Sequence, residues 1–135
     1  MLLSVLVAFL LSACGKYRGY DKVKEAKPIK GICFELEEGT HIINSDAELD
    51  AVLEGQDCPQ LYIDFNTHTL LGFYTEGSGC DIDFSPTLYV NEDDQTYHYV
   101  VKVKERGHCA KLAMTMNWMS VPKIPADYAV EFVKD

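Results

Sequence analysis

The chain has 135 residues, of which 12 are basic and 21 acidic, and its net charge at pH 7 is −9. This length suits one domain with a hydrophobic core of its own. The acidic balance argues against nucleic acid as a partner, because binding to phosphates requires a basic surface that releases their counterions.

Residues 1–13 have the features of a signal peptide. The run from Leu2 to Leu11 is nearly all apolar. It is too short for a membrane-spanning helix of about 20 residues but matches the apolar region of an export signal. The following Leu11-Ser12-Ala13-Cys14 resembles the lipobox of bacterial lipoproteins. This resemblance implies that Cys14 is acylated, with palmitate among its chains, and becomes the first mature residue. A buried N-terminal strand or helix with an incidental cysteine is the alternative.

Two nearby positions bear on localisation. No basic residue precedes Lys16, although signal peptides normally open with one, and this favours a translation start upstream of Met1. Gly15 stands where some Gram-negative systems place an aspartate that retains lipoproteins in the inner membrane. We therefore expect an exported, membrane-anchored protein, with the outer membrane favoured over the inner one in a Gram-negative host.

Residues 14–30 are expected to form a lipidated basic tether. Six basic side chains stand against two acidic ones between Gly15 and Lys30, and apolar residues are few. Such a segment can lie near anionic headgroups, where each basic residue contributes about 1 kcal/mol. A solvated, disordered linker is the alternative. The globular domain is expected over residues 31–135.

The domain opens with Ile32, Phe34 and Leu36, which alternate with polar residues as in a half-buried strand. Residues 41–43 are expected to be extended, and Ser45 and Glu48 then form a capping box, so that a helix runs to about residue 53. Further strands are expected around residues 61–65, 69–75, 88–90, 97–103, 112–118 and 130–132, with a hairpin loop at 91–95 and an irregular crossing at 121–125. The pattern predicts an α+β fold, in which a mainly antiparallel sheet of about seven strands carries one short helix.

Several segments of this body resemble known proteins. They are Ile43-x-Ser45-x-x-Glu48-Leu49, Ile63-Asp64-Phe65, Thr69-Leu70-Leu71-Gly72 and Pro122-Lys123-Ile124-Pro125. Together they resemble small bacterial lipoproteins of uncharacterised function and, more loosely, the regulatory subunit domain of certain bacterial protease complexes. The resemblance implies a non-catalytic accessory protein, and it assigns no active-site residue to this chain.

Four cysteines remain besides the lipobox cysteine: Cys33, Cys58, Cys80 and Cys109. An even number in an exported domain predicts disulfides that staple the fold. A zinc site is disfavoured because no C-x-x-C occurs, and free thiols are the remaining alternative. Each bridge would contribute about 3–4 kcal/mol in the chain-entropy model.

The pairing follows from the predicted hairpin. Its loop centres near Asp93, and Cys80 and Cys109 lie almost equidistant from that centre. Facing positions on paired strands are close enough for a disulfide. We therefore predict Cys80–Cys109, with an irregularity at Pro86 that absorbs the offset, and by elimination Cys33–Cys58.

No group of residues predicts catalysis, a metal site or a cofactor. Gly77-Ser78-Gly79 lacks the spacing of a nucleophile elbow and is interpreted as a turn. A Cys80 nucleophile with His108 as its base would need a free thiolate, which a disulfide would remove. The acids at 81–83 and 92–94 do not fit a calcium loop and are interpreted as exposed side chains of turns.

Aromatic residues offer a candidate contact surface. Tyr97 and Tyr99 project from one face of a predicted strand, and tyrosines are favoured at interfaces. A structural role in the sheet is the alternative. Trp118, with Met114 and Met116, is expected in the core.

Two classes of function follow. The first is a membrane-anchored lipoprotein that acts as a non-catalytic binding or accessory module of the cell envelope, with an envelope protein as its possible partner. The second is a small envelope enzyme with an unrecognised active site. The lack of a paired acid and base favours the first.

Overall fold

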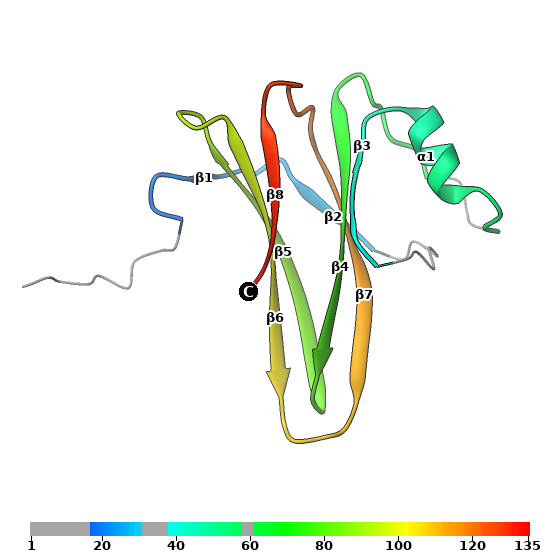
Figure 1. Ribbon diagram of the computed structural model, residues 1–135, viewed down its shortest axis with the longest axis vertical. Helices are drawn as coiled ribbons and strands as arrows, with labels where there is room; N and C mark the ends of the chain where they lie inside the picture. The colour runs from blue at the N-terminus through cyan, green and yellow to red at the C-terminus, as the bar shows by residue number, and fades with distance from the viewer. Residues whose placement is uncertain (1–16, 31–37, 58–60) are drawn as a thin grey trace, which may run out of the picture.

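The computed structural model describes residues 17–30, 38–57 and 61–135, and these fold into two four-stranded β-sheets packed face to face (Figure 1). In chain order the elements are β1 (Asp21–Lys22), β2 (Lys27–Ile29), β3 (Thr40–Ile43), α1 (Asp46–Leu53), β4 (His68–Ser78), β5 (Asp81–Asn91), β6 (Thr96–Arg106), β7 (Leu112–Pro122) and β8 (Ala129–Lys134). The prediction of a mainly β structure with one short helix is confirmed for these residues.

The strands separate into what we call the β5–β6 sheet, of order β1-β5-β6-β8, and the β4–β7 sheet, of order β2-β7-β4-β3. All pairs are antiparallel except β6 with β8, which is parallel. The expectation of one main sheet is thus corrected to two. The long strands β4 to β7 continue past their short neighbours and form a narrow arm, residues 76–84 and 103–114, at the lower end of Figure 1.

The space between the sheets holds the larger core. Alternate side chains of the long strands point inward, since the side-chain period of a strand is two. The buried members are Leu71, Leu88, Tyr99, Val101, Met119, Val121 and Ile124. A second core lies on the outer face of the β4–β7 sheet and contains Ile43, Leu49, Ile63, Phe65, Leu70 and Trp118. The β4–β7 sheet is therefore buried on both faces in its upper half, as the apolar run at 69–75 predicts.

Helix α1 covers that outer face and begins where the sequence predicts. Ser45 Oγ accepts a hydrogen bond from Glu48 N at 3.1 Å, and Glu48 Oε2 accepts one from Asn44 N at 2.6 Å. The first bond satisfies an amide that the first helical turn leaves free. The second holds the residue before the cap, so the reciprocal bond of the predicted capping box falls on Asn44 rather than on Ser45. Among the described residues no helix is long and apolar enough to cross a membrane.

Two expected local features are wrong. Residues 61–65 form no strand, although Ile63 and Phe65 are buried, because this segment packs as a loop on the outer face of the β4–β7 sheet. The irregularity predicted at Pro86 is absent, because the β5–β6 register runs unbroken through the Pro86–Val101 pair. Trp118 is buried as expected and Met116 is half-buried, but Met114 is 53% exposed.

The segment expected to be a loose tether is folded where the structure describes it. In residues 17–30, which we call the strap, β1 pairs with β5 and β2 pairs with β7. Val23 and Ala26 pack against the core between the sheets. The domain therefore begins at or before residue 17 rather than at 31. The signal peptide, Cys14 and the strand predicted around Ile32 lie outside the described residues.

Candidate binding groove

The arm has a groove along one edge of the sandwich. Because β1 and β2 are short, they pair with only the upper parts of β5 and β7 and leave both strands uncovered below. A cavity of about 310 Å³ opens there. It is lined by residues 28–30 of the strap, by 82–84 and Pro86 of β5, and by 115–118 of β7.

The polar groups on the floor of the groove connect the two sheets. Asn117 is only 7% exposed, and its Nδ2 donates to Phe73 O at 2.9 Å and to Thr75 Oγ1 at 2.8 Å. The hydroxyl of Tyr99 on the opposite sheet donates to Asn117 O at 2.7 Å. Burial raises the pKa of Tyr99 because the phenolate would lose its hydration. These groups are structural, since buried polar atoms need such partners.

The walls of the groove combine apolar side chains with strand backbone. Leu88 O accepts a hydrogen bond from Val23 N, so the backbone groups of Leu88 point away from β6 and toward this edge. Groups alternate sides along an antiparallel strand, which places those of Phe84 and Ile82 on the same open edge. The backbone of Pro86 faces the same edge but has no N–H to donate. An added strand would therefore lack one hydrogen bond there, and this limits strand addition at this edge. The groove is thus a concave site whose lining mixes apolar side chains with polar ones such as Lys30, Asp83 and Thr115, and such a combination suits binding.

A second hollow of about 310 Å³ lies at the start of α1, between residues 44–46 and 62–66. Several of its polar groups already have partners. Lys123 Nζ donates to Asn44 O at 3.1 Å and to Phe65 O at 2.8 Å, and Asp64 Oδ1 accepts from Asn66 N at 3.0 Å. The groove is therefore the better candidate for a ligand.

The two tyrosines proposed as a contact surface do not form one. Tyr99 is fully buried between the sheets, so it cannot meet a partner. Tyr97 is half-buried on the same side of β6, and its ring lies 5.4 Å from that of Tyr128. The alternative, a structural role, is correct for Tyr99. The signal was in the sequence, because both share their parity along the strand with Val101 and Val103.

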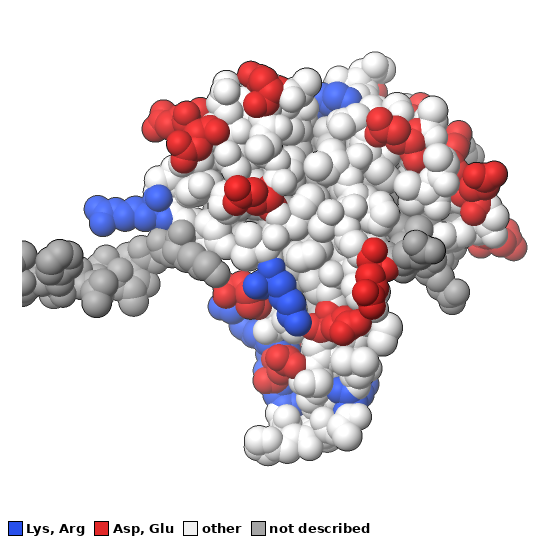
Figure 2. Space-filling model, viewed as in Figure 1, with Lys and Arg blue, Asp and Glu red and all other residues white. Residues whose placement is uncertain are grey.

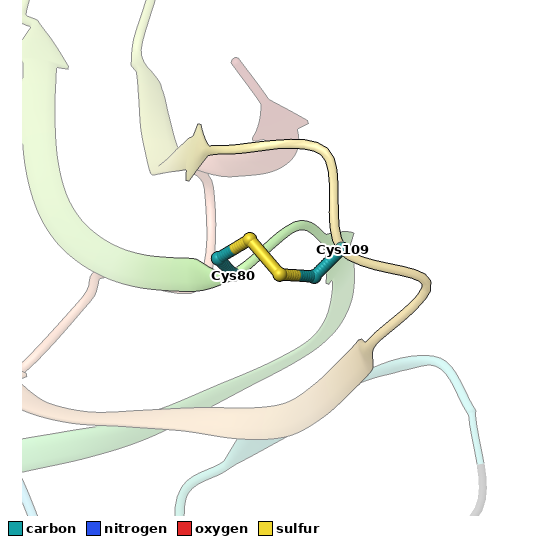
Figure 3. The surroundings of a disulfide bond; sticks show 2 residues. All are labelled: Cys80 and Cys109. Atoms are coloured by element: carbon teal, nitrogen blue, oxygen red, sulfur yellow. A yellow bond between two sulfur atoms is a disulfide. The ribbon is translucent and has the colours of Figure 1, made fainter.

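The predicted Cys80–Cys109 disulfide is present (Figure 3). It connects the β4–β5 turn to the β6–β7 loop, the two places at the tip of the arm where the chain crosses between sheets. Its Cα atoms are 4.7 Å apart. Because Cys80 is bonded, it cannot act as a nucleophile with His108. The predicted Cys33–Cys58 bridge, like Cys14, lies outside the described residues.

Most of the acidic residues considered as calcium ligands have other partners. Arg106 Nη1 contacts Asp81 Oδ2 at 2.7 Å and Asp83 Oδ2 at 2.9 Å. These two carboxylates raise the pKa of the guanidinium. In the β5–β6 loop, Asp94 Oδ2 accepts from Asn91 Nδ2 at 3.1 Å, and Glu92 Oε2 accepts from the hydroxyl of Tyr128. No cluster of potential metal ligands occurs within residues 17–30, 38–57 and 61–135.

Two arrangements were missed from the sequence, namely the groove and the folded strap. The groove depends on where short strands stop pairing, which no local pattern reports. For the strap, a signal existed: Tyr17, Tyr20, Val23 and Ile29 are its apolar members, and all four contact the body of the domain.

Comparisons with protein-family models, with curated proteins and with solved structures find no match to this chain.

Proposed function

We propose that the chain is an exported lipoprotein, anchored to a bacterial membrane through acylated Cys14, and that its sandwich is a non-catalytic binding or accessory module of the cell envelope. The observation that carries the proposal is Leu11-Ser12-Ala13-Cys14 directly after an apolar run. The Cys80–Cys109 disulfide supports export, because such bonds persist in oxidising compartments and are rare in the cytosol. Gly15 favours the outer membrane in a Gram-negative host.

The groove supports a binding role. Its apolar walls, Ile82, Phe84 and Met116, suit contact with an apolar segment of an envelope protein. Asp83 at its rim is held by Arg106, and the side chain of Asn117 on its floor is held by the neighbouring strand β4. Neither group is therefore placed to act as a general base on a bound molecule.

Anchoring is tested by growing cells with labelled fatty acid and fractionating them. Label should enter the wild-type protein, and the protein should sediment with membranes. Cys14→Ser should abolish labelling and either release the protein or leave it unprocessed. A wild-type chain that takes up no label would contradict the proposal.

Binding is tested by cross-linking in native envelopes, followed by purification of the adducts. Thr115→Arg places a long charged side chain in the groove and should reduce the yield of a specific adduct. Leu112→Arg is the matched control, because Leu112 lies on the same strand, is 56% exposed and does not line the groove. Equal losses in both variants would exclude the groove as the contact site. Turnover of a peptide, ester or glycan by the purified domain, lost on one substitution, would instead favour an enzyme.

A further inference from the structure

The strap is attached to the outer face of the β5–β6 sheet by aromatic rings. Tyr17 stacks on Tyr89, with ring centroids 4.6 Å apart and planes 6° from parallel. The Tyr20 ring lies 4.6 Å from that of His98, and its hydroxyl is hydrogen-bonded to His98 Nε2 at 3.1 Å. His98 Nε2 also lies 3.2 Å from Glu131 Oε2. With β1 and β2 paired further along, the strap is held at both ends.

This attachment limits how far the domain can move from an anchor at Cys14. Three residue steps separate Cys14 from Tyr17, and a fully extended chain covers about 11 Å in that length. A loose stem reaching from residue 15 to 30 would instead behave as a coil of about 20–25 Å. The docked strap therefore brings the surface around Tyr17 to the lipid headgroups.

The layers of the fold then determine which side of the domain faces away from the membrane. Tyr17 lies on the outer face of the β5–β6 sheet, whereas α1 packs on the outer face of the β4–β7 sheet. The two are at opposite sides of the sandwich, as the positions of β1 and α1 show (Figure 1). An anchor next to Tyr17 turns α1 away from the membrane.

The charges agree with this direction. The strap carries five basic and two acidic side chains, whereas residues 46–57, containing α1, carry five acidic and no basic ones. Figure 2 shows acidic groups around the α1 side and at the upper end and a basic group near β1, whereas the middle of this face and the arm carry groups of both signs. On the outer face of the β5–β6 sheet, Asp81 and Asp83 are paired with Arg106, whereas Glu131 lies 3.2 Å from His98 Nε2 and is largely exposed. Anionic headgroups would attract the strap, at about 1 kcal/mol per basic residue close to the surface, and repel the helix.

We infer that the strap orients the anchored domain on an anionic phospholipid surface, with the strap and the outer face of the β5–β6 sheet against the headgroups and α1 facing the aqueous compartment. The inference rests on the proposed acylation of Cys14. With the strap docked in this way, the anchored domain has one preferred orientation instead of rotating freely about its anchor.

The experiment uses the mature acylated chain in phosphatidylcholine–phosphatidylglycerol nanodiscs that contain a gadolinium-labelled lipid. NMR relaxation of the amides in the strap should be enhanced several-fold more than that of the amides in α1. Tyr17→Ala with Tyr20→Ala frees the start of the strap and should make the two enhancements nearly equal. Tyr62→Ala is the matched control, since that side chain is 87% exposed and remote from the strap, and it should keep the wild-type contrast. Equal enhancements in the wild type, or an unchanged contrast in the double variant, would overturn the inference.

Two further measurements separate the possible failures. Mass spectrometry of the N-terminal peptide reports acylation directly, so an unmodified Cys14 would refute the proposed function. In Cys14→Ser protein without lipid, a nuclear Overhauser contact between the Tyr17 and Tyr89 rings should persist, and its absence would refute strap docking by itself. In pure phosphatidylcholine the contrast should decrease, and an unchanged contrast would show that the basic strap does not recognise anionic lipid.

Discussion

Replacing both Cys80 and Cys109 by alanine should destabilise the domain mainly through its unfolded state. The bond closes a loop with a sequence separation of 29. The chain-entropy model gives about 3.6 kcal/mol for a loop of that length at 25 °C. The folded tip keeps other constraints, because Gly79 N donates to Lys111 O at 3.0 Å and Cys80 N donates to Arg106 O at 2.7 Å. The arm should therefore keep its structure while the free energy of unfolding falls.

The assay is urea unfolding followed by the fluorescence of Trp118, the single tryptophan, which is 3% exposed. The midpoint should fall, and the slope m should rise, because a chain without the cross-link exposes more surface when it unfolds. Substituting Cys33 and Cys58 by alanine provides a comparison that leaves the arm bridge intact. A loss below about 1 kcal/mol for the arm variant would refute the entropic reasoning. A non-reducing peptide map that joins Cys80 to Cys33 would refute the pairing itself.

Three other changes test the packing and the polar contacts. Tyr99→Phe removes a buried hydrogen bond to β7 and should cost about 1–2 kcal/mol in thermal or urea unfolding. Tyr97→Phe removes a hydroxyl that makes no hydrogen bond to the described residues, and it should stay within about 0.5 kcal/mol of wild type. Gly72→Ala would place a Cβ 2.6 Å from the Trp118 ring and should lower the free energy of unfolding by about 1–3 kcal/mol. Combining it with Trp118→Leu removes that overlap, so Gly72→Ala should cost less in the Trp118→Leu background than in the wild type. The pKa of Tyr128 is raised to about 12, first by the hydrogen bond that its hydroxyl donates to a loop carboxylate and then by burial. Because the folded pKa is above the ordinary value of 10.0, its stabilising effect is complete below pH 10 and is lost as the pH rises toward 12. Ultraviolet titration should show several late phenols, among them Tyr99, and Tyr128→Phe should remove one of them.

The strands that the sequence predicts best are β4, β6 and β7, whose expected ranges 69–75, 97–103 and 112–118 cover most of the observed strands, whereas β5 was expected only at 88–90. A hairpin is symmetric about its loop, so the Cys80–Cys109 pairing could be predicted from spacing, although both cysteines lie just beyond the last paired residues, Asp81 and Arg106. Alternation reports burial, however, and not hydrogen bonding. Residues 61–65 therefore gave a strand-like pattern while packing as a loop, with Ile63 and Phe65 inserted into the outer core.

What remained hidden depends on contacts distant in the chain. Whether β4 to β7 make one sheet or two is decided by crossings at the tip of the arm, and each crossing is a short turn with no distinctive local pattern. The strap was expected to be a basic tether, with a disordered linker as the alternative, because few of its residues are apolar. Its few apolar residues suffice for docking because each meets a prepared surface, such as the Tyr89 ring.

The strap links the two proposed surfaces. Its first residues dock Tyr17 on the β5–β6 sheet, and its last residues, 28–30, form the upper wall of the groove. The groove lies on the edge of the sandwich that the strap follows. Acylation of Cys14 would therefore place the groove close to the membrane. A partner that enters it would have to present its contact segment near the lipid surface, and this favours another membrane-associated envelope protein over one that diffuses freely. Displacing the strap would alter the wall of the groove as well as the proposed orientation of the domain, so the proposed anchoring and the proposed binding would be coupled through one segment of chain.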